Sequence, residues 1–191
     1  MTNKTNTDLH VVFRALKFAA AKHANQRRKG GDDIPYINHP IEVAEILTSV
    51  AAVCDSDILA AAILHDTIED TDTHQEEIET QFGPHILSLV MECTDDKNLP
   101  KERRKELQIH TAPHKTPQAK LIKLADKISN VRDMGSTPPK DWSLERRRQY
   151  LDWSEKVVSG LRGQHHQLDE TYDQALAAAR ARLESEEKNN H

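Results

Sequence analysis

A continuous apolar segment, ILAAAIL at residues 58–64, runs directly into the segment HDTIED at residues 65–70. The apolar segment is typical of the middle of a buried helix, yet the next six residues carry four ionisable side chains. Burying a charge that has no partner costs on the order of several kcal/mol. Whatever fold the chain adopts must therefore bring compensating groups, or a bound cation, to these side chains.

The rest of the chain is also patterned for helices, because apolar residues recur every three or four positions. The pattern predicts helices at 8–25, from just after Pro40, at 56–70, on either side of a turn at Gly83-Pro84, at 101–110, at 117–134, from Ser143 to about 160, and at 167–186. No segment alternates with a period of two over several residues. The sequence therefore predicts an all-α fold, a compact multi-helix bundle.

Length and composition limit the class of protein. The 191 residues are enough for one domain with a sizeable core, which we expect over residues 1–186, and the polar end predicts a flexible tail at 187–191. Cys54 and Cys93 have no paired spacing, so we expect two reduced, buried thiols rather than a disulfide or a cysteine zinc site.

Charge and hydropathy make two classes of partner improbable. The 31 acidic and 26 basic residues give a net charge of −5, which argues against a nucleic-acid partner. The apolar run at 58–64 is far shorter than the roughly 20 residues that span a bilayer, and the N-terminal segment MTNKTNTDLH has no secretory apolar region. We therefore expect a cytoplasmic protein with no membrane partner, while the oligomeric state stays open.

The spacing within HDTIED predicts a polar site on the helix at 56–70. His65 and Glu69 are four residues apart, as are Asp66 and Asp70, so each pair lies along one stripe of the helix. The two stripes are neighbours, about 100° apart. His65 and Asp66 therefore form one level of the site, and Glu69 and Asp70 form a second level one turn further along.

A divalent cation would offset the burial of these charges, but it needs ligands from elsewhere in the chain. His39, in YINHP, precedes the helix that begins after Pro40, and Asp126, in KLADKISN, interrupts an apolar helix face. With His65 and Asp66 they would make a set of two imidazoles and two carboxylates, which suits Mn²⁺, Fe²⁺ or Zn²⁺ and leaves coordination positions open.

The second level of the site predicts catalysis rather than a structural metal. Glu69 and Asp70 lie beside the proposed ligands without being needed as ligands, so they are placed to orient and deprotonate a water. Asn130 lies four residues after Asp126, over the same helix face.

With these residues assembled, the chain resembles the HD-domain metal-dependent phosphohydrolases, and within them the hydrolase domain of the RelA/SpoT alarmone enzymes. It is most similar to the small stand-alone hydrolases of the metazoan SpoT-homologue type. The segments that carry the resemblance are QRRKGGDDIPYINHPIEVA, AAILHDTIEDTDT, FGPHILSLVMECTDDKNLPKERRKELQ and AKLIKLADKISNVRDM, in the family's order, and they fall within roughly residues 15–165.

The resemblance implies hydrolysis of the 3′-pyrophosphate of ppGpp and pppGpp to GDP and GTP plus pyrophosphate, with Mn²⁺ as the metal. It implies the metal ligands His39, His65, Asp66 and Asp126, and the catalytic pair Glu69 and Asp70. The nucleotide-binding residues that it implies are Arg28, which would pack on the guanine, then Lys29, Asn130, Arg146 and Tyr150. In the basic run at 97–105, Lys101 is the first candidate to attract the diphosphates.

Two other readings stay open. The chain ends where the synthetase domain of the long family members would begin, so we expect no alarmone synthesis. The same site could serve a nucleotide phosphatase with another substrate, such as NADPH, or a sensor that binds alarmones with weak catalysis. The intact Glu69 and Asp70 argue against the sensor, which has no use for a water-activating pair.

Overall fold

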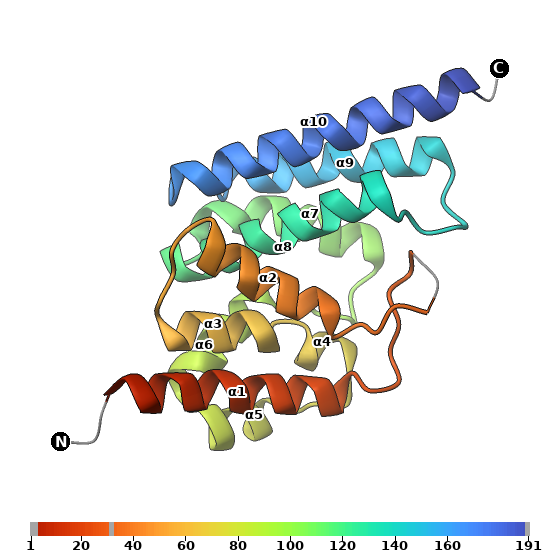
Figure 1. Cartoon of the computed structure of the whole chain (residues 1–191). Coiled ribbons are helices and arrows are strands. Elements are labelled where there is room, and N and C mark those ends of the chain that lie inside the picture. Colours follow the sequence, from red (N-terminus) through yellow and green to blue (C-terminus); the bar gives the residue numbers. More distant parts are fainter. Residues whose placement is uncertain (1–3, 31–32, 190–191) are drawn as a thin grey trace.

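The computed structural model describes residues 4–30 and 33–189, and this part of the chain is helical without a named strand (Figure 1). The elements are α1 (Lys4–Lys22), α2 (Asn38–Ser49), α3 (Ser56–Leu64), α4 (Thr67–Asp70), α5 (Gln75–Phe82), α6 (Pro84–Cys93), α7 (Lys101–Thr111), the 3₁₀ turn η1 (Ala112–His114), α8 (Pro117–Ser136), α9 (Leu144–Ser159) and α10 (His166–Asn189). The predicted all-α bundle is confirmed.

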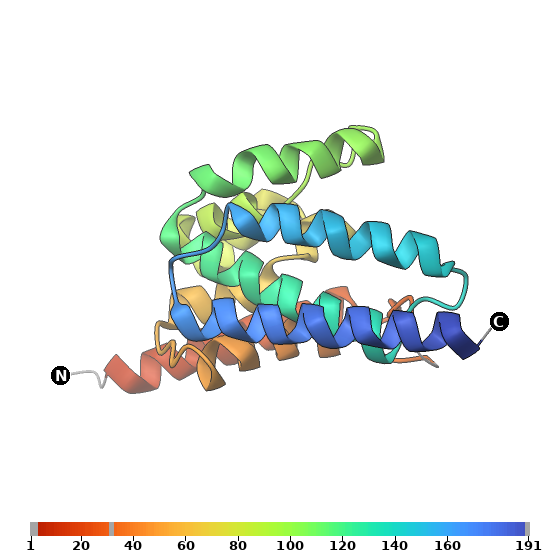
Figure 2. The ribbon, with the colours of Figure 1, turned by 90° about the horizontal axis from the view of Figure 1, so that it is seen from above.

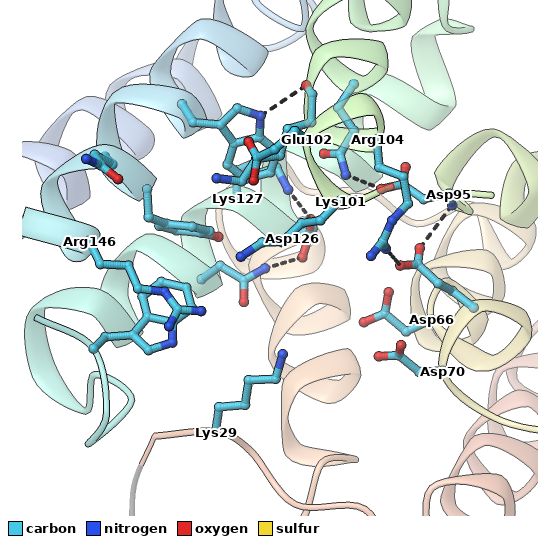
Figure 3. A pocket seen from close by; sticks show the side chains of 18 of the residues that line it. Lys29, Asp66, Asp70, Asp95, Lys101, Glu102, Arg104, Asp126, Lys127 and Arg146 are labelled. Atoms are coloured by element: carbon cyan, nitrogen blue, oxygen red, sulfur yellow. Dashed lines mark hydrogen bonds and ion pairs between the residues drawn. The ribbon is translucent and has the colours of Figure 1, made fainter. Parts of the chain in front are cut away.

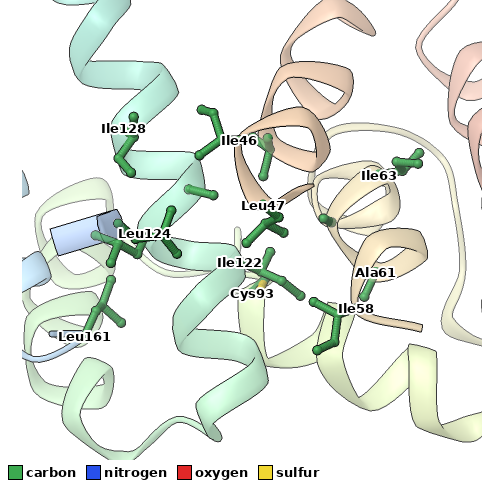
Figure 4. Close-up of a cluster of buried hydrophobic side chains, with 14 of the residues drawn as sticks. Ile46, Leu47, Ile58, Ala61, Ile63, Cys93, Ile122, Leu124, Ile128 and Leu161 are labelled. Atoms are coloured by element: carbon green, nitrogen blue, oxygen red, sulfur yellow. The ribbon is translucent and has the colours of Figure 1, made fainter. Parts of the chain in front are cut away.

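Helix α8 is the central element, since it contacts α2, α3, α6, α9 and α10. Figure 1 shows α1 and α10 at opposite sides of the molecule, and Figure 2 shows α9 between α7 and α10. The core between α2, α3 and α8 is formed by fully buried side chains such as Leu47, Ile122 and Leu124 (Figure 4). Each such side chain contributes about 1.5–3 kcal/mol through burial.

The prediction of one continuous helix at 56–70 is wrong at its most charged point. Helix α3 ends at Leu64 and α4 begins at Thr67, so His65 and Asp66 form the break between them. Two side chains hydrogen-bond to backbone carbonyl groups near the end of α3. His65 Nδ1 lies 2.7 Å from the Ala62 carbonyl oxygen, and the Thr67 hydroxyl donates to the Leu64 carbonyl oxygen. Side chains that bond to backbone carbonyls in this way compete with the helical ladder.

Two helix boundaries and one cysteine also differ from expectation. Helix α2 begins at Asn38, before Pro40, so His39 lies in its first turn rather than in the preceding loop. Helix α10 continues to Asn189, so residues 187–189 are helical rather than part of a tail, and residues 190–191 lie outside the described part of the chain. Glu187 pairs with Arg148 of α9, which helps to hold this last turn. Cys93 is buried, but Cys54 is exposed.

The short helices end and begin where the sequence supplies turn and capping groups. Gly83 separates α5 from α6 with φ of 88°, a conformation that glycine adopts without strain, and Pro84 starts α6. Ser143 caps α9 by accepting from the backbone N–H of Arg146. Among the described residues, none of the helices has the length and apolar character needed to cross a bilayer.

Candidate functional site

Helix α2, the end of α3 and helix α8 bring together two histidines and an aspartate that the sequence separates by up to 87 positions. The ligating atoms of His39, His65 and Asp126 lie within 4.8 Å of one another, and all three residues are buried. Asp126 Oδ1 is 3.2 Å from His39 Nε2 and 3.8 Å from His65 Nε2. Asp66 Oδ2 lies 3.7 Å from His39 Nε2 and 3.1 Å from His65 Nε2. The structure therefore brings three of the predicted ligands into one cluster and places the fourth, Asp66, next to both histidines.

The buried nitrogens of this cluster fit a cation. Neither His39 Nε2 nor His65 Nε2 has a hydrogen-bond partner, although carboxylate oxygens lie close to both. The Nδ1 of His65 must carry a hydrogen, because the carbonyl of Ala62 can only accept. Neutral His65 would thus turn a lone pair toward two carboxylates, which repel it unless a proton or metal ion lies between. A donor set of two nitrogens and two oxygens suits a divalent cation.

The pKa shifts of the clustered side chains also indicate that this position favours positive charge. Burial favours raising the pKa of Asp66, but the neighbouring His65 and His39 hold the pKa of that carboxyl well below its usual range. Burial also opposes charging of His65, yet the carboxylates of Asp66 and Asp126 raise its pKa well above the ordinary value. The pKa of His39 is instead lowered by burial. The Lys127 charge and the two histidines likewise hold the pKa of Asp126 well below its usual range, against the effect of burial. The two carboxylates thus favour positive charge between them, which a bound cation would supply.

Polar neighbours fix the orientation of the two carboxylates. The Tyr36 hydroxyl donates to Asp66 Oδ2 at 2.6 Å. Asp126 Oδ2 pairs with Lys127 at 3.2 Å, while its Oδ1 accepts from Asn130 Nδ2 at 2.5 Å. Asp126 thus turns one oxygen to a buried ammonium group and the other to the histidines. Sequence reasoning missed Tyr36, although its position three residues before His39 places both near the first turn of α2.

Glu69 and Asp70 line the same cavity as Asp66 and Asp126, but each has its own partners. Glu69 accepts from the backbone N–H of Asp95 at 3.0 Å and pairs with Arg104 at 3.5 Å. Burial raises the pKa of Glu69, against the effect of that N–H group. Asp70 pairs with Lys97 at 2.5 Å. A partly buried carboxylate with a raised pKa, such as that of Glu69, is suited to accept a proton from water.

The cavity has a volume of about 850 Å³, and besides carboxylates its lining includes the cations Lys29, Lys101, Lys105 and Arg146. Figure 3 shows Asp66 and Asp70 on one side, Arg146 on the other, and Lys29 and Lys101 between them. Burial lowers the pKa of Lys101, and the charges of Lys105, Arg146 and Lys29 lower it further. Cations held close enough to disfavour one another form a site for a multiply charged anion.

An aromatic wall, formed by Trp142, Tyr150 and Trp153, lines the cavity along α9. The Trp142 and Tyr150 rings lie 5.7 Å apart, and the Tyr150 and Trp153 rings 5.4 Å apart. The Arg146 guanidinium lies 4.3 Å from the Trp142 ring centroid. Sequence reasoning found Tyr150 and Arg146 but missed both tryptophans. Trp142 lies four residues before Arg146 and Trp153 three residues after Tyr150, a helical spacing that could have indicated them.

Arg28 lies in a smaller cavity of about 300 Å³ that shares Lys29, Tyr36 and Tyr150 with the larger one. Its guanidinium donates to Asp133 at 2.6 Å and to Asn130 at 3.0 Å. The same group lies 5.5 Å from the centre of the Tyr36 ring. Arg28 is thus held as a fixed plane, and Asn130 connects it to Asp126.

The basic run at 97–105 divides between the cavity and the surface. Lys101, Arg104 and Lys105 line the cavity, whereas Arg103 pairs with Glu106 on the exposed face of α7. Lys101, the first candidate from the sequence, thus lines the cavity, and its attraction of the diphosphates stays a prediction.

Comparison with known proteins identifies the family to which the chain is similar. A family model of the HD domain matches residues 15–151. The chain is 52% identical over 159 residues to the Homo sapiens protein named guanosine-3′,5′-bis(diphosphate) 3′-pyrophosphohydrolase MESH1, which covers 83% of this chain and 89% of that protein. The Drosophila melanogaster protein of the same name is 48% identical over 162 residues, or 85% and 90% of the two chains. A solved structure described as a metazoan orthologue of SpoT that hydrolyses ppGpp is similar with a TM-score of 0.85 at 46% identity, over 87% of this chain and 94% of that one.

Proposed function

Because the chain belongs to the HD-domain family, we propose that it is a metal-dependent guanosine-3′,5′-bis(diphosphate) 3′-diphosphatase, which hydrolyses ppGpp and pppGpp to GDP and GTP plus pyrophosphate. One observation carries the proposal beyond the family: the buried cluster of His39, His65 and Asp126, with Asp66 beside both histidines, adjoins a cavity whose lining is rich in cations and aromatic rings. A substrate with a purine and two diphosphate groups offers a matching distribution of charge and ring surface.

The proposed metal ligands are His39, His65, Asp66 and Asp126. A divalent cation held there, for which we propose Mn²⁺, would supply a Lewis acid next to the attacked phosphorus and make a nearby water more acidic. The chain's contribution is to fix the four ligands in place before the ion arrives, since a buried and hydrogen-bonded donor set has little freedom to rearrange.

Glu69 is proposed as the base that takes a proton from the attacking water, with Asp70 orienting that water. The oxygen of the water forms a bond to the phosphorus on the ribose 3′-oxygen, and the bond between that phosphorus and the 3′-oxygen breaks. The 3′-oxygen takes up a proton, and the two phosphoryl groups leave as pyrophosphate. Arg104 and the Asp95 N–H hold the Glu69 carboxylate in place for this step.

The nucleotide is proposed to lie across both cavities. Arg28, held flat by Asp133 and Asn130, offers a guanidinium plane that can stack on guanine. Further contacts are proposed for Lys29, Asn130, Lys101, Arg146 and Tyr150. The aromatic wall adds Trp142 as a stacking surface beside Arg146.

The test of the proposed function is product identification. Purified protein incubated with ppGpp and Mn²⁺ is expected to release GDP and pyrophosphate in equal amounts. A chelator is expected to stop the reaction, because it removes the Lewis acid that would act on the phosphorus and on the attacking water. Chromatography of the nucleotides and an enzymatic pyrophosphate assay measure both products. Parallel incubations with Mg²⁺ and Zn²⁺ identify the preferred metal.

Two outcomes would favour the other readings. Release of orthophosphate from NADPH at a higher kcat/KM than turnover of ppGpp would assign the site to a broader nucleotide phosphatase. Binding of ppGpp by calorimetry with no product formed would assign the chain to alarmone sensing.

Gly30 provides a test of the proposed guanine-binding loop, which carries Arg28 and Lys29. A Cβ atom at Gly30 would lie 1.7 Å from the Thr137 carbonyl oxygen, so Gly30→Ala must separate the loop that carries Arg28 and Lys29 from the segment after α8. We expect kcat/KM for ppGpp to fall roughly 10- to 100-fold, since small displacements of positioning groups have effects of this size. Mn²⁺ affinity, measured by calorimetry on the same preparation, is expected to stay within about threefold of wild type, because the metal ligands lie on other elements. An unchanged kcat/KM would contradict a role for this loop.

A further inference from the structure

Ser129 joins one of the proposed metal ligands to a carboxylate that is not part of the ligand set. The serine is fully buried on α8, and its Oγ lies 2.9 Å from His39 Nδ1 and 2.9 Å from Glu42 Oε2. His39 and Glu42 are three residues apart on α2, so both reach the same hydroxyl across the contact between α2 and α8. Neither Ser129 nor Glu42 has a part in the mechanism described above.

The chemistry of the three groups fixes the direction of both hydrogen bonds. An ionised carboxylate only accepts, and Glu42 lies 3.6 Å from the Arg132 guanidinium through its other oxygen. The Ser129 hydroxyl therefore donates its one hydrogen to Glu42. With that hydrogen committed, the serine oxygen can only accept from His39, so Nδ1 of His39 carries the hydrogen. The lone pair of neutral His39 is then on Nε2, the atom 3.2 Å from Asp126 Oδ1.

We propose that Glu42 and Ser129 are positioning residues that fix the tautomer and ring orientation of His39 so that its Nε2 is free to bind a divalent cation. The inference rests on the metal site of the proposed function and does not depend on the substrate. Partners of this kind, which hold the second nitrogen of a ligating histidine, typically contribute 10- to 100-fold to metal affinity.

The two proposed ligand histidines differ in how they are held. His65 uses the backbone carbonyl of Ala62, three residues earlier in the same chain segment, so no side-chain substitution removes its acceptor. His39 instead depends on a side chain 90 positions away, which depends in turn on Glu42. The relay from Glu42 through Ser129 to His39 therefore couples the spacing of α2 and α8 to the metal site.

The first measurement is the affinity of purified variants for Mn²⁺ alone, by calorimetry without nucleotide. Ser129→Ala is expected to weaken binding roughly 10- to 100-fold, because the His39 N–H loses its acceptor in a buried position. Glu42→Gln can still accept from Ser129 through its amide oxygen, so its Mn²⁺ affinity is expected to stay within about threefold of wild type. The Mn²⁺ affinity of Glu42→Leu, which has no acceptor, is expected to fall nearly as far as that of Ser129→Ala. Glu45→Leu removes an equal charge from an exposed position one turn further along α2 and is expected to bind as wild type does.

The second measurement separates positioning from general packing. In the metal-free protein, ¹⁵N NMR shifts of the His39 ring are expected to show the hydrogen on Nδ1 in wild type and Glu42→Gln, and a mixture of tautomers in Ser129→Ala and Glu42→Leu. Thermal unfolding of the metal-free variants checks that each is folded under these conditions. A purely structural serine would alter unfolding and leave the tautomer unchanged.

The proposal is overturned if Ser129→Ala binds Mn²⁺ as wild type does, or if Glu45→Leu loses as much affinity as Glu42→Leu. It is also overturned if the Ser129→Ala tautomer equals that of wild type. Wild-type protein that binds Mn²⁺ but leaves ppGpp intact would contradict the proposed function and leave the positioning role standing.

Discussion

Asp126→Ala is expected to lose divalent-cation binding and hydrolysis together. The carboxylate of Asp126 contacts both ligand histidines and the buried Lys127. Without it, the two histidines lose one of the two neighbouring carboxylates, and the buried Lys127 loses its ion-pair partner. Loss of a ligand should exceed the 10- to 100-fold effect of losing a neighbour of a ligand, so Mn²⁺ affinity should fall more than about a hundredfold. Turnover of ppGpp should fall at least as far.

The design must separate loss of the site from loss of the fold. Asp126→Ala removes the volume and the hydrogen bonds of the side chain as well as its charge, so Asp126→Asn, which keeps the shape and can still accept from Asn130, serves as a second variant. Circular dichroism and thermal unfolding of both metal-free variants establish that they are folded, and Glu45→Gln controls for removal of one acidic group. A folded Asp126→Asn protein with wild-type Mn²⁺ affinity would contradict the assignment of the metal site.

Glu69→Gln is expected to keep the metal and lose the reaction. Glu69 lines the cavity beside the ligands and is absent from the cluster of mutually close ligating atoms. A glutamine can retain the bond from the Asp95 N–H through its amide oxygen, so the local structure should persist. The amide cannot accept a proton from water, however, and general bases typically contribute 10²- to 10⁴-fold. We expect kcat for ppGpp to fall by about that factor while Mn²⁺ affinity changes less than about threefold.

The split between binding and turnover is the informative result for Glu69. Steady-state kinetics at saturating Mn²⁺ give kcat and KM, and calorimetry on the same samples gives metal affinity. KM should change little, because the nucleotide contacts come from other residues. Glu69→Asp, which keeps the basic group but shortens its reach, should recover part of kcat. A Glu69→Gln enzyme with wild-type kcat would remove Glu69 from the mechanism.

The local part of the site could be predicted from the sequence because helix geometry relates residues that are close in the chain. The pattern HDTIED follows an apolar run, so its four charges had to meet compensating groups wherever the helix packed. The break between α3 and α4 escaped prediction, since it arises when the side chains of His65 and Thr67 bond to backbone carbonyls. Helical periodicity in the sequence does not show where side chains compete with the backbone N–H groups for carbonyl oxygens.

The long-range part of the site needed the packed molecule. His39 and Asp126 were predicted as ligands from their chemical type and their places at a helix start and on an apolar face. Their approach to 3.2 Å is set by the packing of α2 against α8. The supporting groups Tyr36 and Ser129 carried no comparable signal, because an isolated tyrosine or serine in a helical chain has many ordinary roles.

The helical character of the chain, the uncompensated charge of HDTIED and the residue types able to hold a cation could all be predicted from the sequence. The packed molecule was needed to show which atoms face one another: the Nε2 atoms of His39 and His65, the two oxygens of Asp126 toward the histidines and Lys127, and the cations that line the cavity. Helical periodicity acts over a few residues, whereas these contacts join segments up to 90 positions apart whose separation is fixed by core packing.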